Sequence, residues 1–248
     1  MRVMLLHKST PDTEAGKVPP MDLIQRVGGM IADRKGAGVF RDGAGLRSSA
    51  LGVRLTFAGG KRTETPGPFI GGNEDPAALC ILKVRHRDEA VRHATSFAAV
   101  LGDGECDIRP VTEPWDLGFG EKPKDDPTTR YMLVWKADQA RQGEGALPSL
   151  QSRAALGRLI ADLTAQGVFQ QGEAFRPSRD AKRFALTPGK RRAVDGPFAE
   201  SKELISGFCT IEVPTMADAL PWAERYLAAV GEVELDLRPL FEPADLKA

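Results

Sequence analysis

The chain has 248 residues, of which 34 are basic and 34 acidic, so its formal net charge at pH 7 is zero. Binding to nucleic acid or to an anionic membrane needs a clustered basic face, and the sequence shows no such cluster. The longest apolar runs are far shorter than the roughly 18 residues of a membrane span, and residues 1–7 are too short for the core of a signal peptide. We therefore expect a cytoplasmic protein without nucleic-acid or membrane partners.

Cysteine usage points to a reducing compartment. The three cysteines, Cys80, Cys106 and Cys209, are odd in number, and we expect buried small apolar side chains and not disulfides or metal ligands. The sequence contains no phosphate-binding or dinucleotide-binding motif, no His/Cys ligand spacing and no nucleophile elbow. It therefore predicts neither a metal nor a cofactor.

Hydrophobic periodicity predicts an ordered series of strands and helices in residues 1–116. The order is strand, helix, short strand, β-hairpin, strand, helix and strand. We expect these elements at residues 2–6, 22–35, 39–40, 53–57 with 63–65, 79–84, 90–101 and 105–109, respectively. Gly28 and Gly29 interrupt the first helix. Because each glycine costs about 1 kcal/mol relative to alanine, we expect this helix to be shorter or looser than its counterpart in the second half.

The same order of elements recurs in the second half, at an offset of 129 residues, although the first strands match at 128. We expect the elements at residues 130–134, 150–166, 168–169, 183–186 with 192–194, 208–213, 219–230 and 233–238. Ser149 is a plausible N-cap of the first helix, and Thr215 with Asp218 resembles a capping box before the second. The predicted domains are a first unit (1–116), a linker rich in Gly, Pro, Lys and Asp (117–129) and a second unit (130–248).

Each unit has the order of elements of a ferredoxin-like α+β fold with an inserted hairpin. Helices on one face of such a sheet leave its other face to be covered. We therefore expect the two units to pack face to face as an internal pseudo-dimer that resembles a dimeric α/β barrel. A further homodimer is an open alternative.

One stretch, residues 195–203 (DGPFAESKE), has an altered copy at residues 66–74 (PGPFIGGNE). Both copies keep Gly-Pro-Phe, in which the glycine is conformationally free and the proline restricts the bond before it and offers no N–H to a sheet. This trio predicts a sharp corner at the end of the hairpin. The acid before it and most of the polar residues after it occur in the second copy alone, so the corner does not require them.

This stretch, the opening residues 131–134 (YMLV) and residues 172–177 (GEAFRP) resemble the YCII-related family in its DGPF branch. The second unit matches along nearly its whole length and the first in outline. The resemblance implies a dimeric α/β-barrel fold and a small pocket with an acid/base role for an Asp, with a His beside it in some relatives. Because His7, His86 and His93 all lie in the first unit, the His–Asp dyad is not carried over. Some members of the branch resemble proteins encoded beside alternative sigma factors, which implies a regulatory link.

Asp195 is the candidate catalytic residue. The candidate ligand-binding residues around it are Glu173, Gly196, Pro197, Phe198, Glu200 and Lys202. The first unit has replaced the charged members of this set with Pro66, Ala44, Gly71 and Asn73, which predicts that function lies in the second unit alone. The alternative is that Asp195 accepts hydrogen bonds from its own turn and that Glu173, Glu200 and Lys202 are solvated charges.

Other polar residues are interpreted as structural. Arg183 and Glu203 are kept in the first unit as Arg54 and Glu74, as is the ending E-x-D-x-R-P, so we expect them to serve the fold of both units. The run 190–192 (KRR) is expected to be a solvated hairpin tip, and His7 a core or rim histidine and not a catalyst.

Two functions of different class remain open. In the first, the second unit is a cofactor-free lyase-type or isomerase-type enzyme, in which burial raises the pKa of Asp195 so that it shuttles a proton on a small organic substrate. In the second, the protein is a small-ligand binding or regulatory module without catalysis.

Overall fold

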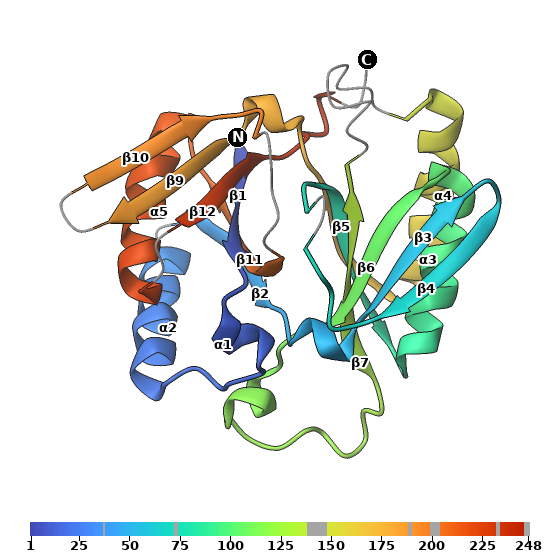
Figure 1. Ribbon diagram of the computed structural model, residues 1–248, viewed down its shortest axis with the longest axis horizontal. Helices are drawn as coiled ribbons and strands as arrows, with labels where there is room; N and C mark the ends of the chain where they lie inside the picture. Colours follow the sequence, from blue (N-terminus) through green and yellow to red (C-terminus); the bar gives the residue numbers. More distant parts are fainter. Residues whose placement is uncertain are drawn as a thin grey trace. The chain divides into compact units, whose positions relative to one another are not determined.

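The computed structural model describes residues 1–36, 38–71, 74–137, 148–187, 190–198, 204–231 and 234–245 (Figure 1). Over these residues the fold is mixed α+β, with two six-stranded sheets whose paired strands are all antiparallel. The chain divides into two compact units, Met1–Gly45 with Phe175–Ala248 (unit 1) and Leu46–Ala174 (unit 2).

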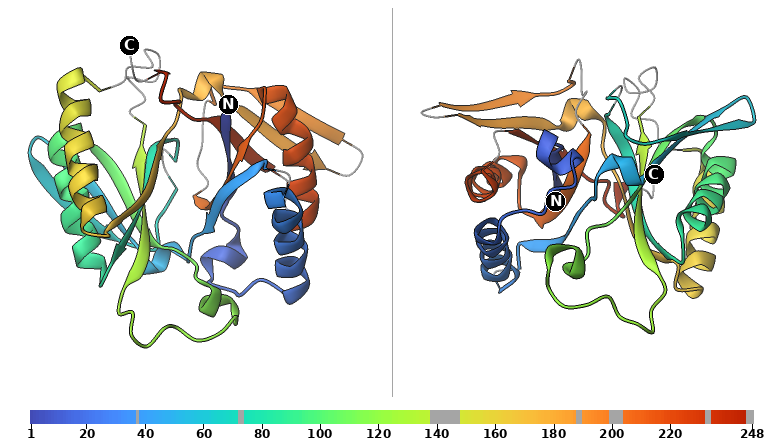
Figure 2. Two further views of the ribbon diagram at one scale, coloured as in Figure 1. Left: turned by 180° about the vertical axis from the view of Figure 1, so that it is seen from behind. Right: turned by 60° about the horizontal axis from the view of Figure 1, so that its bottom comes forward.

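Unit 1 contains the sheet β10-β9-β12-β1-β11-β2. Its strands are β1 (Arg2–Lys8), β2 (Phe40–Gly45), β9 (Lys182–Thr187), β10 (Lys190–Asp195), β11 (Ile205–Glu212) and β12 (Glu234–Pro239). Its helices are the short α1 (Pro11–Glu14), α2 (Met21–Gly36) and α5 (Met216–Val230), with a 3-10 turn at Ser178–Asp180. Helices α2 and α5 lie on the same face of this sheet (Figure 2).

Unit 2 contains the sheet β4-β3-β6-β7-β5-β8. Its strands are β3 (Val53–Ala58), β4 (Lys61–Pro66), β5 (Pro76–Val84), β6 (Gly104–Pro110), β7 (Thr129–Lys136) and β8 (Phe169–Ala174). Its helices are α3 (Arg87–Leu101) and α4 (Leu150–Ala165), with 3-10 turns at Ser49–Leu51 and Pro114–Leu117. The predicted linker 117–129 connects β6 to β7 inside this unit.

The strand order in both sheets is consistent with the predicted ferredoxin-like plan. In unit 1 the opening strand β1 lies between the closing strand β12 and the third strand β11, with β2 at the edge. In unit 2 the strands β6, β7, β5 and β8 repeat this order. In each sheet the extra hairpin is added beside the closing strand, so that β10 or β4 forms the other edge.

The compact units differ from the predicted division of the chain at residues 117–129. Strands β1 and β2 come from the first half of the sequence, yet they pair with β11 and β12 from the second half. Strands β7 and β8 conversely join β5 and β6. Unit 2 is therefore continuous in sequence and is inserted between Gly45 and Phe175 of unit 1. Packing of the two units as a pseudo-dimeric barrel stays a prediction.

The physical reason is that strand pairing is non-local. The apolar run of β1 (Val3, Leu5) marks it as a central strand, and the matching run of β7 does the same. Register is specified by the pattern of buried side chains, and that pattern is nearly the same in both strands. The residues of either strand therefore do not determine which of the two similar sheets the strand joins.

The helices begin and end largely as predicted. The Ser149 side chain caps α4, and Thr215 with Asp218 forms the expected capping box before α5. Helix α2 was expected to be shorter or looser than α4, and it is not shorter, since both span 16 residues. Its residue Met30 packs against the unit 1 core, and such tertiary packing outweighs the modest cost of two glycines.

All three cysteines are buried thiols, as expected. They lie on β5, β6 and β11, and burial raises the pKa of Cys80 and of Cys209 to about 12. His7 is also buried, and its ring meets Tyr226 of α5 edge-on at 4.5 Å between centroids. This confirms that His7 is a core histidine.

The Gly-Pro-Phe corners follow β4 and β10, and both contain a cis Gly-Pro bond. The Gly196 N–H donates to the Ala181 carbonyl at 3.0 Å. A Cβ atom at Gly196 would lie 1.8 Å from the carbonyl oxygen of Ser178, and one at Gly67 would lie 1.8 Å from that of Ser49. Glycine is therefore needed at both corners because the backbone of a 3-10 turn approaches so closely.

We predict that Gly196→Ala lowers the free energy of unfolding by at least about 2 kcal/mol, because a backbone carbonyl cannot move aside cheaply. Gly157→Ala in α4 is the matched control, since a Cβ there meets nothing within 4 Å. It should be neutral or stabilising by up to about 1 kcal/mol. Urea denaturation measures both, and equal unfolding free energies for the two variants would refute the steric explanation.

Candidate functional site

A groove of about 380 Å³ lies in unit 1 beside the Gly196-Pro197 corner. It is lined by Arg183, Ala185, Arg192, Val194, Pro197, Phe198 and Glu234. Phe184 of β9 packs into the core with α5, so its neighbours Arg183 and Ala185 project from the opposite face of the sheet. The groove therefore lies on the sheet face that the helices do not cover.

The register of the hairpin brings the lining residues together. Arg192 lies opposite Ala185, and Val194 lies opposite Arg183. Glu234 of β12 is the partner of Ala185 on its other side. Three adjacent strands thus present their side chains to one surface, and Pro197 and Phe198 close its end.

A buried ion pair supports this surface. The Arg183 guanidinium donates to both carboxylate oxygens of Asp236, at 2.7 and 3.0 Å, and Lys8 Nζ lies 2.5 Å from the same carboxylate. The Asp236 side chain is only 5% exposed. Burial alone would raise the pKa of Asp236, but the hydrogen bonds and charges of Arg183 and Lys8 outweigh it and hold this pKa below its usual value.

Phe198, the phenylalanine of the corner, packs against Arg183 of this ion pair. The guanidinium carbon of Arg183 is 4.5 Å from the centroid of the Phe198 ring, a distance at which a cation and an aromatic face attract each other. Glu234 approaches the same guanidinium at 3.3 Å. Arg183 thus connects the hairpin, the last strand and the corner.

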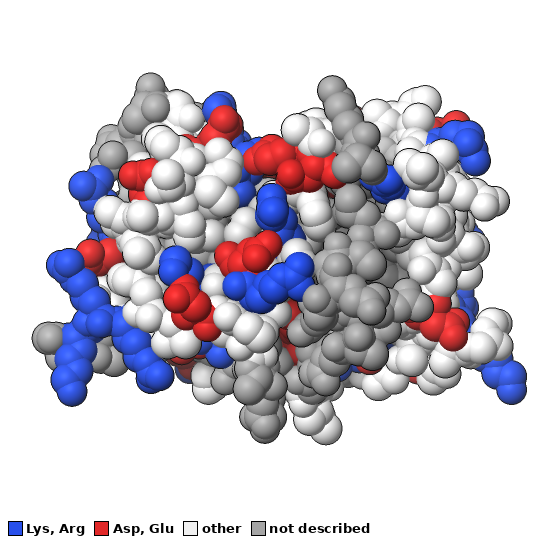
Figure 3. All heavy atoms as spheres, turned by 90° about the horizontal axis from the view of Figure 1, so that it is seen from above, with Lys and Arg blue, Asp and Glu red and all other residues white. Residues whose placement is uncertain are grey.

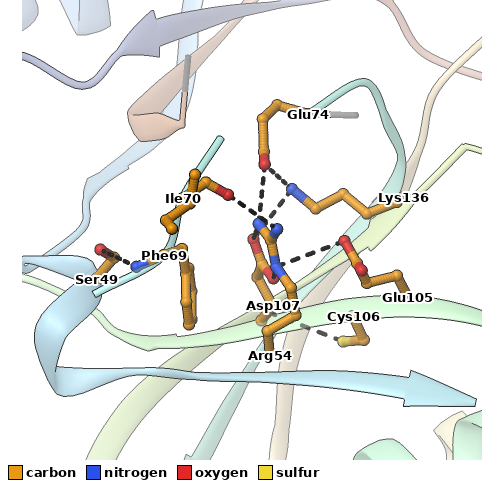
Figure 4. Close-up of polar contacts among 9 residues, drawn as sticks. All are labelled: Ser49, Arg54, Phe69, Ile70, Glu74, Glu105, Cys106, Asp107 and Lys136. Atoms are coloured by element: carbon orange, nitrogen blue, oxygen red, sulfur yellow. Dashed lines mark hydrogen bonds and ion pairs between the residues drawn. The ribbon is translucent and has the colours of Figure 1, made fainter. Parts of the chain in front are cut away.

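Unit 2 contains a matching set, which we call the Arg54 cluster: Arg54, Glu74, Glu105, Asp107 and Lys136 (Figure 4). Arg54 donates to both oxygens of Asp107 at 2.6 and 2.8 Å and to Glu74 at 2.9 Å. Lys136, whose side chain is 6% exposed, contacts Glu74 and lies 3.0 Å from Asp107. The guanidinium carbon of Arg54 lies 4.9 Å from the centroid of the Phe69 ring. Phe198 makes the same kind of contact with Arg183.

The Arg54 cluster perturbs two carboxyl groups in opposite directions. Burial would raise the pKa of Asp107, but the hydrogen bonds and charges of Arg54 and Lys136 lower it below its usual value. Burial raises the pKa of Glu105, and the charge of Arg54 opposes this only in part. The ion pairs support the structural interpretation of Arg54 and Arg183; Glu203 lies outside the described residues.

The two units differ in the residues beside this cluster. Where unit 1 has Ala185, Arg192 and Val194, the same strand positions of unit 2 have Thr56, Thr63 and Thr65. Arginine, phenylalanine and carboxylates are shared, so they are sufficient for either corner to form. The extra arginine and the apolar pair are particular to unit 1.

Asp195 does not face the groove. It pairs in register with Lys182 and accepts a hydrogen bond from the Lys182 amino group. Its side chain is 76% exposed, so the expectation that Asp195 is partly buried is wrong. The reason is strand alternation, because Asp195 follows Val194 and therefore projects from the opposite face. Its catalytic role stays a prediction.

The other predicted residues are dispersed. Pro197 and Phe198 line the groove, and Gly196 packs against the 3-10 turn. Glu173 lies on β8 of unit 2, opposite Leu79, and so in a different compact unit from Asp195. Glu200 and Lys202 lie outside the described residues. The ligand-binding roles of all six stay predictions.

Sequence reasoning missed Arg183, Arg192 and Glu234 as groove residues. Arg192 was interpreted as part of a solvated hairpin tip, and Arg183 as structural. The signal for Arg192 was present, since at the predicted offset of 129 residues it aligns with Thr63.

Acidic and basic side chains are interspersed on the face of the molecule in Figure 3. Basic side chains gather at the left margin of this view, where Figure 1 places the hairpin β9–β10.

In the part of the chain that the structure describes, no group of three or more His, Cys, Asp or Glu side chains is arranged to hold a metal ion. No helix of this part is long and apolar enough to cross a bilayer.

We predict that Asp107 contributes to acid denaturation. The pKa of Asp107 is lower in the folded protein than in the unfolded chain, where it is about 3.9. Ionised Asp107 therefore stabilises the folded state above about pH 4, and this contribution is lost as the pH falls through the folded-state pKa. Asp107→Asn should cost about 3–5 kcal/mol at pH 7 and should weaken the dependence of stability on pH below 4. Urea denaturation at several pH values measures this, with the exposed Asp125→Asn as control. An unchanged pH dependence in Asp107→Asn would contradict the assignment.

A family model matches part of the chain. Residues 129–233 match the model of the YCII-related domain. No curated protein and no solved structure matches the chain. The matched segment runs from β7 through α5 and so contains the hairpin β9–β10 and the Gly196-Pro197 corner. The DGPF branch and the tandem duplication stay predictions, whereas residues 129–233 are similar to a YCII-related domain.

Proposed function

We propose that unit 1 is a small-ligand binding module and that the groove beside the Gly196-Pro197 corner is its site. The observation that carries the proposal is the composition of the groove, in which apolar walls from Val194, Pro197 and Phe198 meet two guanidinium groups within about 380 Å³. Ligand sites typically combine mostly apolar walls with a few placed polar groups in a volume of about 300–1,000 Å³. The matched segment of the YCII-related domain includes these walls.

The groove supports binding better than acid/base catalysis. A general acid or base works best when its pKa lies near the working pH. The pKa of Asp236 is instead lowered, since Arg183 and Lys8 overcome the effect of burial. Asp195, the other candidate, projects from the opposite face with an exposed carboxylate. A cofactor-free enzyme that uses Asp195 is the alternative that the experiment below tests.

The proposed site belongs to unit 1 alone, the compact unit that contains the Gly196-Pro197 corner of the predicted second unit (130–248). Unit 2 keeps the arginine and the phenylalanine of the corner but has threonine at three flanking positions. Its corner therefore folds without the cationic and apolar groove residues of unit 1. The link to sigma-factor regulation, a further homodimer and a cytoplasmic location remain predictions.

We predict that Phe198→Ala strongly reduces retention of a small-molecule ligand, because it removes the aromatic wall of the groove. The purified chain is incubated with a metabolite extract, separated by size exclusion and analysed by mass spectrometry. Phe69→Ala is the matched control, since Phe69 makes the same contact with an arginine in unit 2. We expect retention to fall at least about tenfold in Phe198→Ala and to persist in Phe69→Ala.

Asp195→Asn separates binding from catalysis in the same experiment. A binding module retains its ligand in this variant, with stability changed by less than about 1 kcal/mol. Loss of a product that the unsubstituted protein forms would establish the acid/base enzyme instead. Equal loss of ligand in Phe198→Ala and Phe69→Ala would refute a site confined to unit 1.

A further inference from the structure

We infer that the ligand of the groove is a small organic anion with a flat apolar part, and that Arg192 selects it by its charge. This inference rests on the proposed function and adds the chemical class of the ligand. It starts from the contrast between the two arginines that line the groove, Arg183 and Arg192.

The guanidinium of Arg183 is engaged within the protein. It donates twice to Asp236, lies 3.3 Å from Glu234 and has the Phe198 ring over it. These contacts engage Nε, Nη2 and one face of the group. Arg183 therefore holds the groove wall in position and has little remaining capacity for a ligand.

Arg192 differs from Arg183. It is exposed on β10, and it makes no hydrogen bond or ion pair with any residue that the structure describes. Its neighbour Arg191, on the other face of the strand, is by contrast paired with Glu224 at 2.6 Å. A guanidinium always carries its charge and presents several N–H donors in a planar fork that fits carboxylate and phosphate oxygens. An anionic group is the ligand chemistry that complements Arg192.

The apolar residues that line the groove determine the uncharged part of the ligand. Val194 and Ala185 lie side by side with Arg192 on the same surface, and Pro197 with Phe198 closes it. Their contact surface is apolar and includes one aromatic ring, which favours a flat, aromatic or conjugated group. The carboxylate of Glu234 is already balanced by Arg183 at 3.3 Å, so it does not make the groove selective for cations.

Unit 2 shows that a corner of this kind folds without an arginine at the position of Arg192. Thr63 occupies its position in unit 2, where the hairpin, the corner and the Arg54 cluster all form. Thr65 and Thr56 likewise replace the apolar pair. The residues that the two units share build the corner. The residues that differ are the ones that would contact the charged group and the apolar part of the ligand.

The experiment compares three probes on the full chain: 2-naphthoate, 2-naphthyl phosphate and the neutral 2-naphthylmethanol. Ligand-observed NMR titration gives a dissociation constant for each. We expect at least one anionic probe to bind about tenfold or more tightly than the neutral one, the difference expected for one charge-assisted contact. Comparison of carboxylate with phosphate identifies which anion the groove accepts.

Arg192→Ala should weaken binding of the anionic probes about tenfold, to the level of the neutral probe, and leave the neutral probe unchanged. Arg191→Ala is the matched control and should change none of the three constants. If the neutral probe binds as tightly as both anions and Arg192→Ala changes nothing, the inference is overturned; the proposed function still stands if Phe198→Ala weakens that binding. If no probe binds, the inference is overturned, and the proposed function fails with it if the metabolite experiment also finds no ligand.

Discussion

The ion pair between Arg183 and Asp236 is the interaction on which the groove depends. It joins the hairpin to the closing strand and places a cation beneath Phe198, so the position of the corner phenylalanine follows from it. Charges are costly to bury unless their hydrogen bonds are satisfied. Here the contact is bidentate, and Lys8 adds a second cation to the same carboxylate. The pair recurs as Arg54 with Asp107, which makes it a requirement of the corner and not of one ligand.

Strands from both halves of the sequence complete each cluster. Lys8, at the end of β1 in the first half, contacts Asp236 of the second half, while Lys136, at the end of β7 in the second half, contacts Asp107 of the first. Neither half alone supplies both the lysine and the carboxylate of one cluster. The strands that could have completed either sheet therefore also contribute the second cation that keeps a buried Asp ionised.

Local sequence patterns predicted the elements, the ferredoxin-like order and the Gly-Pro-Phe corner, because each of these depends on neighbouring residues. The cap at Ser149 and the close approach at Gly196 are of this kind. The sheet that β1 joins could not be predicted, since its pairing depends on residues more than 200 positions away, as in Arg2 with Glu212. The face of Asp195 was missed because a shift of one position at a strand end reverses a side chain. Arg192 was missed because a basic residue near a hairpin tip is usually solvated, and its role depends on the neighbouring strands.

The central claim is that unit 1 and unit 2 share a structural corner, and that three flanking positions at which they differ make the corner of unit 1 a ligand site. A crystal structure of the protein with 2-naphthoate or 2-naphthyl phosphate, whichever binds more tightly, tests it most directly. The account predicts the anionic group of the probe at the guanidinium of Arg192 and its rings against Val194 and Phe198, with the Arg183–Asp236 pair unchanged. Density for the probe beside Phe69 in unit 2, or on the face that carries Asp195, would contradict it.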